Sequence, residues 1–150
     1  MEGAALSEET DRPRTLRAIK KCLSDSFDHF QDAMDELDEI GQGSIGPGMA
    51  PIVGGYALPD PEKRYRAALI SIDTAEKALN PLLKRWKDGR VNETHFQNEE
   101  ALVLLKDISE FEYDIIMNKL SEKSGRESVW YRLRELTDKI ERVFHLVADV

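Results

Sequence analysis

The residues best suited to chemistry in this sequence lie in its first third, where carboxylates surround a histidine. Four of them fall on one side of a predicted helix, at steps of four, three and four residues: Asp25, His29, Asp32 and Glu36. Carboxylates with an imidazole suit a divalent transition metal. A di-metal bundle, however, takes Glu and Glu-x-x-His motifs from facing helices, and no other predicted helix has a Glu-x-x-His. We therefore interpret the group as a solvated face, and we assign no metal ligand, cofactor site or catalytic residue.

Charges are separated along the same helix. Basic residues occupy its start (Arg12 to Lys21) and acidic residues its end (Asp25 to Glu39). This order opposes the helix macrodipole, which prefers anions at the N-terminus. One explanation is structural, because cations such as Arg64 at the start of the next helix would balance the acidic end if the two helices are antiparallel. The other is an acidic docking face for a basic partner, with these candidate residues: Asp28, Asp32, Asp35, Glu36 and Glu39.

The segment from Gly41 to Pro59 contains no charged residue and is rich in Gly and Pro. It lacks the Gly-Lys-Ser/Thr end of a phosphate-binding loop, so we exclude that role. Its apolar side chains would cost solubility if they were exposed. Two interpretations remain, a loop that covers the seam of the bundle and a partner-binding segment. The partner-binding candidates here are Ile45, Met49, Ile52, Val53 and Tyr56.

Three other side chains with reactive groups have less informative surroundings. Cys22 is the single cysteine, which excludes an intramolecular disulfide, and we expect a half-buried inert thiol. His95 and His145 have no nucleophile or carboxylate at a local spacing that would indicate a catalytic pair, so we expect structural or surface roles for both. The run from Lys84 to Arg90 mixes basic residues with Trp86, but Trp86 lies on an apolar stripe, and we expect it in the core.

Apolar residues recur at steps of three and four along most of the chain, which predicts four amphipathic helices. Their limits are set by capping residues, glycines and prolines: the first between Asp11 and Gly41, the second between Asp60 and Gly89, the third between Thr94 and Gly125, the last from Arg126 to near the end. Thr94 and Gln97 form a capping-box pattern for the third helix. We expect the second helix to continue through Pro81 with a kink.

Apolar stripes identify the buried faces of these helices. Leu16, Leu23 and Phe30 lie a heptad apart on the first helix, a coiled-coil-like spacing. The last helix has a regular stripe: Val129, Leu133, Leu136, Ile140, Val143 and Val147. The third helix has the widest apolar surface, so we expect it to be the most buried. Its predicted inner face consists of Ala101, Leu104, Ile108, Phe111, Ile115 and Leu120.

The predicted fold is all-α, a four-helix up-down bundle with a long uncharged loop between the first and second helices. Short Gly-containing links favour an antiparallel run for the last three helices, whereas the long loop leaves the direction of the first open. We expect a flexible N-terminal tail over residues 1–11 and a single bundle domain over residues 12–150, with residues 41–59 as the Gly/Pro-rich loop.

Bulk properties narrow the classes of function. The chain has 150 residues and a formal net charge of −8, which makes nucleic acid an unlikely partner. It shows no signal-peptide pattern and no apolar run of membrane-spanning length, so we expect a soluble protein of the cytoplasm or nucleus, without a membrane partner.

The absence of a nucleophile, metal or phosphate-binding motif favours a non-enzymatic protein–protein interaction module, a subunit or adaptor of a larger assembly. It would bind a protein partner or self-associate through its helix faces. Two alternatives stay open. One is a small acidic inhibitor or immunity-type protein that masks a basic site. The other is a ligand-binding protein or enzyme with a pocket in the bundle core, for which Ser26 and Asn118 are the nearest polar candidates.

Overall fold

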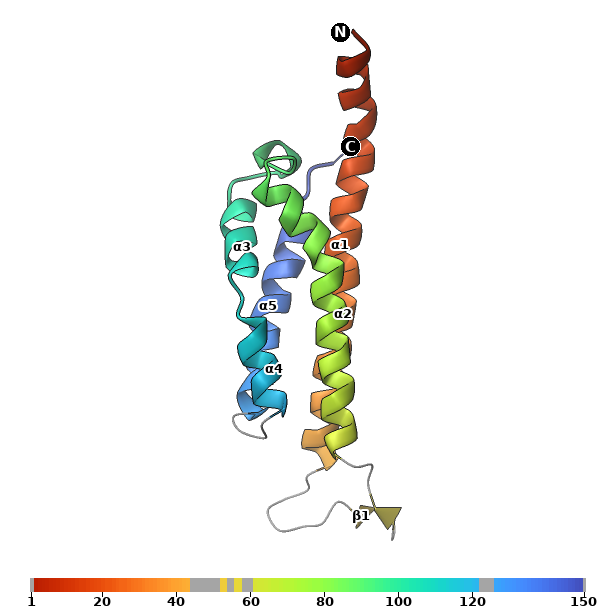
Figure 1. Cartoon of the computed structure of the whole chain (residues 1–150), viewed down its shortest axis with the longest axis vertical. Helices are drawn as coiled ribbons and strands as arrows, with labels where there is room; N and C mark the ends of the chain where they lie inside the picture. Colours follow the sequence, from red (N-terminus) through yellow and green to blue (C-terminus); the bar gives the residue numbers. More distant parts are fainter. Residues whose placement is uncertain (1, 44–51, 54–55, 58–60, 122–125, 150) are drawn as a thin grey trace.

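The computed structural model describes residues 2–43, 52–53, 56–57, 61–121 and 126–149, and the side chains within 11–39, 62–121 and 128–149. Five α-helices account for most of it (Figure 1): α1 (Glu2–Gly43), α2 (Pro61–Lys87), α3 (Glu100–Ser109), α4 (Tyr113–Ser121) and α5 (Arg126–Leu146). A 3-10 helix, η1, spans Glu93–His95, and two two-residue strands, β1 (Ile52–Val53) and β2 (Tyr56–Ala57), pair antiparallel. The all-α prediction is confirmed, but the prediction of four helices is not.

The helices run up and down a common long axis (Figure 1). α1 and α2 are antiparallel neighbours, α3 and α4 follow one another in a single direction, and α5 returns beside them. α1 packs on α2 and α5, whereas α3 packs on α5, and α4 contacts both α2 and α5. The direction of α1, which the sequence left open, is therefore antiparallel to α2.

The core consists of the apolar stripes. Leu16, Leu23 and Phe30 of α1 are at most 1% exposed. The whole predicted stripe of the last helix is buried as well, from Val129 on α5 to Val147 just after its end. These stripes face one another inside the chain, so burial of apolar surface within one molecule accounts for the heptad spacing.

The third predicted helix is interrupted. It ends at Ser109, the backbone turns through Glu110 to Glu112, and α4 begins at Tyr113. Phe111 and Tyr113 explain the break, since residues two apart on a continuous helix point about 200° from each other. Here both rings turn inward and meet edge to face with centroids 4.8 Å apart.

The break also shifts the buried face of this segment. Leu105 and Ile116 are fully buried, in place of the predicted Leu104 and Ile115. Ile115 is 40% exposed and Val103 62% exposed. The prediction that this segment is the most buried of the chain is therefore wrong.

The predicted start of that helix at Thr94 is also wrong. The capping box belongs to η1 and uses Asn92 and His95, because the Asn92 side chain accepts from the Thr94 amide and Nδ1 of His95 accepts from the Asn92 amide. α3 starts only at Glu100, whose amide donates to Oδ1 of Asn98. A Gly-free, Pro-free loop separates these two elements.

One further helix limit differs from expectation. α1 begins at Glu2, before the predicted start at Asp11, so residues 2–11, which were expected to form a tail, are helical. α2 continues through Pro81, as expected. Figure 1 shows its C-terminal part leaning toward α3. In the helices that the structure describes, none combines the length and apolar character needed to cross a bilayer.

Candidate protein-interaction groove

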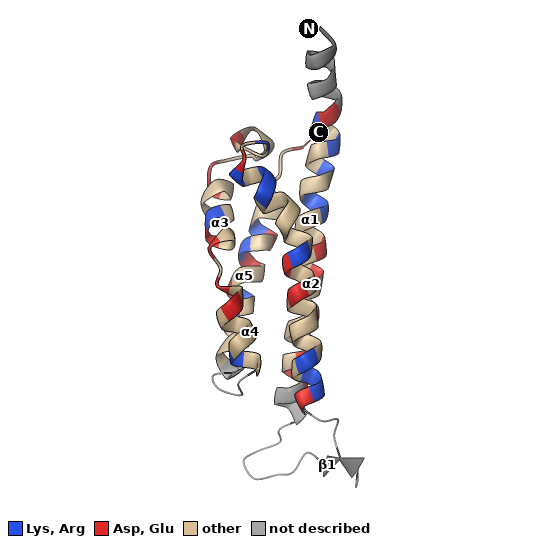
Figure 2. Cartoon of the chain, viewed as in Figure 1, with Lys and Arg blue, Asp and Glu red and all other residues tan. Residues whose placement is uncertain are grey.

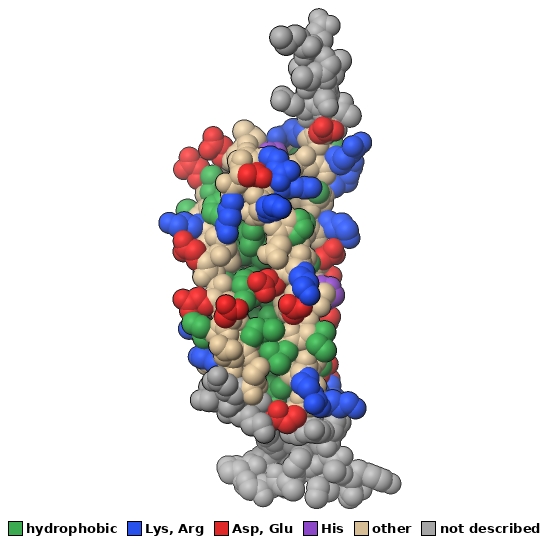
Figure 3. All heavy atoms as spheres, viewed as in Figure 1, with side chains coloured by type: hydrophobic (Ala, Val, Ile, Leu, Met, Phe, Trp, Pro, Cys, Tyr) green, Lys and Arg blue, Asp and Glu red, His purple; other side chains and the backbone are tan. Residues whose placement is uncertain are grey.

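A groove of about 1100 Å³ opens between α2 and the junction of α3 with α4. Its α2 wall runs from Glu76 to Lys87, and Arg90 extends this wall beyond the helix. The opposite wall runs from Ser109 to Ile115. Figure 3 shows hydrophobic side chains gathered in a band between these two sides of the molecule.

The groove exists because α3 is held on α5. Two ion pairs join these helices: Arg142 to Glu100 at 2.9 Å, and Lys139 to Asp107 at 3.6 Å. α4, by contrast, reaches back to α2. The bundle is thus closed at the level of α4 and open at the level of the α3–α4 junction. Buried Leu83 and half-buried Phe111 contribute apolar surface there.

Tyr113 anchors the junction. Its ring stacks on Phe30 of α1, and its hydroxyl oxygen is shielded from solvent with no hydrogen-bond partner within the described residues. Burial, together with the nearby charge of Glu76, raises the pKa of Tyr113 far above its ordinary value. The phenol is therefore held in its protonated form.

A small cluster of carboxylates lies beside this ring. Burial raises the pKa of Glu76, and the charges of Asp73 and Asp114 raise it further. Lys77 only partly offsets them, because its ammonium bonds Asp73 at 2.8 Å. The end of the groove near α4 is thus negative and short of cations.

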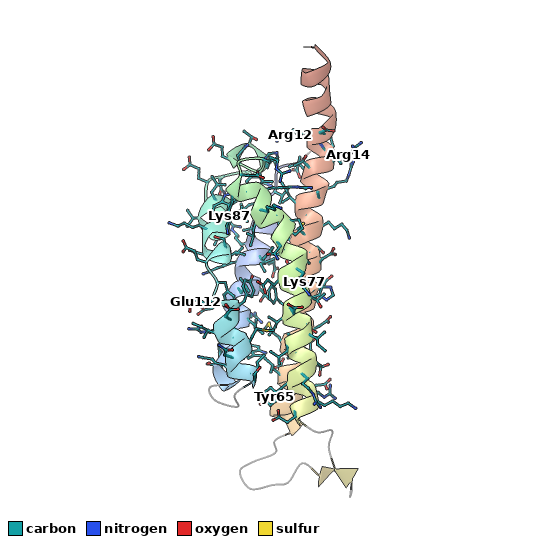
Figure 4. All side chains as sticks on the ribbon, viewed as in Figure 1. Arg12, Arg14, Tyr65, Lys77, Lys87 and Glu112 are labelled. Atoms are coloured by element: carbon teal, nitrogen blue, oxygen red, sulfur yellow. The ribbon has the colours of Figure 1, made fainter. Side chains whose placement is uncertain are left out.

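The other end of the groove is positive. Lys84 and Lys87, on the last turn and a half of α2, are exposed, and neither forms a direct ion pair in the described part of the chain. Asp88, whose pKa is lowered chiefly by its hydrogen bonds with Arg90, also lies within reach of the charge of Lys84. Arg90 is held by Asp88 at 2.8 Å. Figure 4 labels Lys77 and Lys87 on α2 and Glu112 on the junction, and Figure 3 shows Lys and Arg side chains clustered toward the C-terminal end of α2. Five basic and three acidic side chains line the groove, on a chain whose net charge is −8.

The predicted acidic face of α1 divides into two sets. Glu36 and Glu39 both pair with Arg64 of α2, the former at 3.0 Å. The antiparallel arrangement thus provides the balancing cation that the charge order called for (Figure 2). Asp28, Asp32 and Asp35 remain exposed, with Asp35 accepting from Gln31 and Asp32 4.0 Å from His29. No group of three or more potential metal ligands occurs among the residues that the structure places.

The uncharged loop gives little information. Ile45 and Met49 lie outside the described residues. Ile52, Val53 and Tyr56 belong to β1 and β2, and their side chains are not described. The structure therefore leaves this candidate segment as a prediction.

The remaining reactive side chains, Cys22, His95 and His145, have structural or surface positions. Cys22 is half-buried, and burial raises the pKa of its thiol. His95 belongs to the η1 cap, and the loop that contains it is clamped to the end of α5, since Ala148 donates to the carbonyl of His95 at 2.8 Å. His145 lies 3.7 Å from Glu141 on the exposed side of α5.

The groove was missed from the sequence because its walls come from segments about 30 residues apart. One signal was visible. Lys77, Lys84 and Lys87 share a face of the second helix that has no apolar residue to explain its basic character. The other wall could not be predicted, because it forms at the helix break near Glu110, where the sequence contains no Gly or Pro.

No protein-family model, curated protein or solved structure matches the chain.

Proposed function

We propose that this chain is a non-enzymatic protein–protein interaction module, a subunit or adaptor that binds a helical segment of a partner in the groove between α2 and the α3–α4 junction. The observation that carries the proposal is the opening between these elements, with apolar surface at its base and charged rims. Helix-in-groove binding uses this combination, because apolar anchors supply affinity and rim charges supply orientation.

The size of the groove suits such a segment. A helix about 10 Å across fills about 1100 Å³ over a length of about 14 Å, which is about nine residues. The groove has this volume. A single small side chain or a lone ion would leave most of it to water, whereas two or more helical turns would exclude water from Leu83 and Phe111.

The core offers less support for a buried ligand site. The two buried polar side chains of the described core both bond their own helices: Ser26 donates to the carbonyl of Leu23, and Thr137 to that of Arg134. Asn118, the other polar candidate, is exposed. Nothing in these contacts points to a ligand-binding or catalytic cluster in the core.

Self-association through the heptad stripes has less support too. Those stripes are already buried against each other within one chain. Large apolar side chains that remain exposed, such as Ile70 and Tyr131, lie on different helices. The groove, by contrast, brings several apolar side chains together at one place on the surface.

Site-specific photo-crosslinking tests the proposal. A benzophenone side chain replaces Ile115, which lines the groove, or Ile70, which is 68% exposed on α2 outside it. Expressed in the native host, the chain with the probe at position 115 should form a discrete crosslinked species that the chain with the probe at position 70 lacks. Equal crosslinking at both positions, or none at position 115, would overturn the assignment of the groove.

A further inference from the structure

The distribution of charge in the groove specifies the chemistry of its occupant. We infer that the groove selects an amphipathic helix of a partner protein with acidic residues near one end and a basic residue two to three turns away, the acidic end lying against Lys84 and Lys87. This inference rests on the proposed function of the groove and adds the sequence pattern of the partner.

The positive end supplies the first half of the pattern. Lys84 and Lys87 are three residues apart, so they present two ammonium groups on one face of α2. Of the other basic side chains nearby, Arg90 bonds Asp88 and Lys77 bonds Asp73, whereas Arg85 is half-buried. An occupant with one or two carboxylates here would pair with the exposed ammonium groups of Lys84 and Lys87.

The negative end supplies the second half. Glu76 on α2 faces Asp114 on α4, and Glu112 lies on the same wall as Asp114. Neither carboxylate forms an ion pair among the described residues, and burial together with the charges of Asp73 and Asp114 raises the pKa of Glu76. A lysine or arginine of the occupant would balance the negative charge of these carboxylates.

The two ends are far enough apart to be recognised separately. Glu76 and Lys84 are eight residues apart on one helix, or about 12 Å. A partner helix that lies along α2 therefore needs about two to three turns between its acidic and basic residues. Between them, its apolar residues would cover Leu83, Phe111 and Ile115.

A second copy of this chain fits less well. Its acidic α1 face offers carboxylates at Asp28, Asp32 and Asp35, but the residues around them on the exposed side are polar. Such a face would bring no apolar side chains to the base of the groove. The occupant is therefore a different protein, and light scattering of the purified chain should give a monomer.

A displayed peptide library tests the inference. Eighteen-residue helices carry fixed Leu and Ala on one face, and Glu, Lys or Gln at random on the flanking positions. They are selected on the purified full chain, on a Lys84→Glu/Lys87→Glu chain, and on a Lys63→Glu/Arg66→Glu chain. The last pair has the same spacing and charge change, is exposed on α2, and lies outside the groove.

We expect the wild-type and control chains to enrich Glu at one end of the peptide and Lys two to three turns away. The Lys84→Glu/Lys87→Glu chain should lose the Glu enrichment, and a peptide selected on the wild type should bind it about tenfold more weakly. If this chain fails to fold by circular dichroism, Lys84→Gln/Lys87→Gln replaces it, with the same loss of enrichment expected. A self-associating wild-type chain, or one charge pattern shared by all three chains, would overturn the inference.

Selection also separates this inference from the proposed function. Peptides that need Ile115 for binding but show no charge pattern would overturn the inference and leave the groove as a docking site. Peptides whose binding is unchanged by Ile115→Arg would overturn both.

Discussion

The ring of Tyr113, the first residue of α4, stacks on the ring of Phe30 of α1, with centroids 6.1 Å apart and planes 15° from parallel. This contact fixes the α3–α4 junction to the most buried part of α1, because Phe30 is fully shielded from solvent. One wall of the groove is therefore attached to the core. The hydroxyl of Tyr113 at the same time places a polar atom without a hydrogen-bond partner among the described residues in that core.

Replacing Tyr113 with Phe should leave stability unchanged or raise it by up to about 1 kcal/mol, because it removes a buried hydroxyl without a partner. Phe30→Ala should instead cost about 3–5 kcal/mol, since it empties a fully buried site. Urea unfolding followed by circular dichroism measures both values. A loss of more than about 1 kcal/mol in Tyr113→Phe would mean that the hydroxyl is bonded in the folded protein.

The ion pair between Arg64 and Glu36 should be energetically coupled. Both side chains are about two-thirds shielded from solvent, and the hydrogen bond between them raises the pKa of Arg64. In a double-mutant cycle, Arg64→Gln and Glu36→Gln should each lower the melting temperature, and the double variant should lose less than the sum. The coupling should shrink as salt is raised. Additive losses at low salt would contradict the pairing.

Much of the fold could be predicted from the sequence. The stripes of α1, α2 and α5 are long and regular, so their buried faces emerged from periodicity alone, as Leu16 and Val129 show. The break at Glu110 could not be predicted, because it results from a tertiary contact. Phe111 and Tyr113 each gain more by packing inward than a continuous helix would allow.

The candidate site shows the same limit. Sequence reasoning identified the acidic end of α1, and it also identified Arg64 as a possible balancing cation. It could not place Glu76 near Asp114, because that requires the relative position of α2 and α4. The charge of a side chain can be read from the sequence. The groove, however, depends on the spacing between α2 and the α3–α4 junction, which only the tertiary structure gives.

His95 should make stability depend on pH. Burial lowers its pKa, and the positive charge of Arg12 acts in the same direction. The unfolded chain therefore binds the proton more readily, so the stabilisation is complete above the unfolded value of about 6.5 and is lost as pH falls through the folded pKa. Protonation of Nδ1 would also remove its bond from the Asn92 amide.

Urea unfolding at pH 7.5 and pH 5.5 tests this dependence, with His95→Gln as the comparison. The wild type should lose more stability than the variant between the two pH values. An equal loss in both proteins would show that His95 contributes nothing to the acid sensitivity.

The exposed carboxylates of α1 distinguish groove binding from masking of a basic site. Asp28→Lys/Asp32→Lys/Asp35→Lys changes the charge of a face that lies outside the groove. Under the groove proposal, a partner should bind this variant within about threefold of the wild type. A masking protein should lose its target entirely, as measured by titration calorimetry.

Binding of the partner in the groove can be tested by comparing two arginine substitutions. Ile115→Arg places a charge on apolar surface inside the groove, whereas Ile70→Arg makes the same change at an exposed site on α2 outside it. The affinity of each for the protein captured at position 115 is measured by titration calorimetry, after circular dichroism and thermal melting show that both variants fold. We expect Ile115→Arg to weaken binding at least about tenfold and Ile70→Arg to leave it unchanged. Equal affinity of the two variants would show that the partner does not bind in the groove.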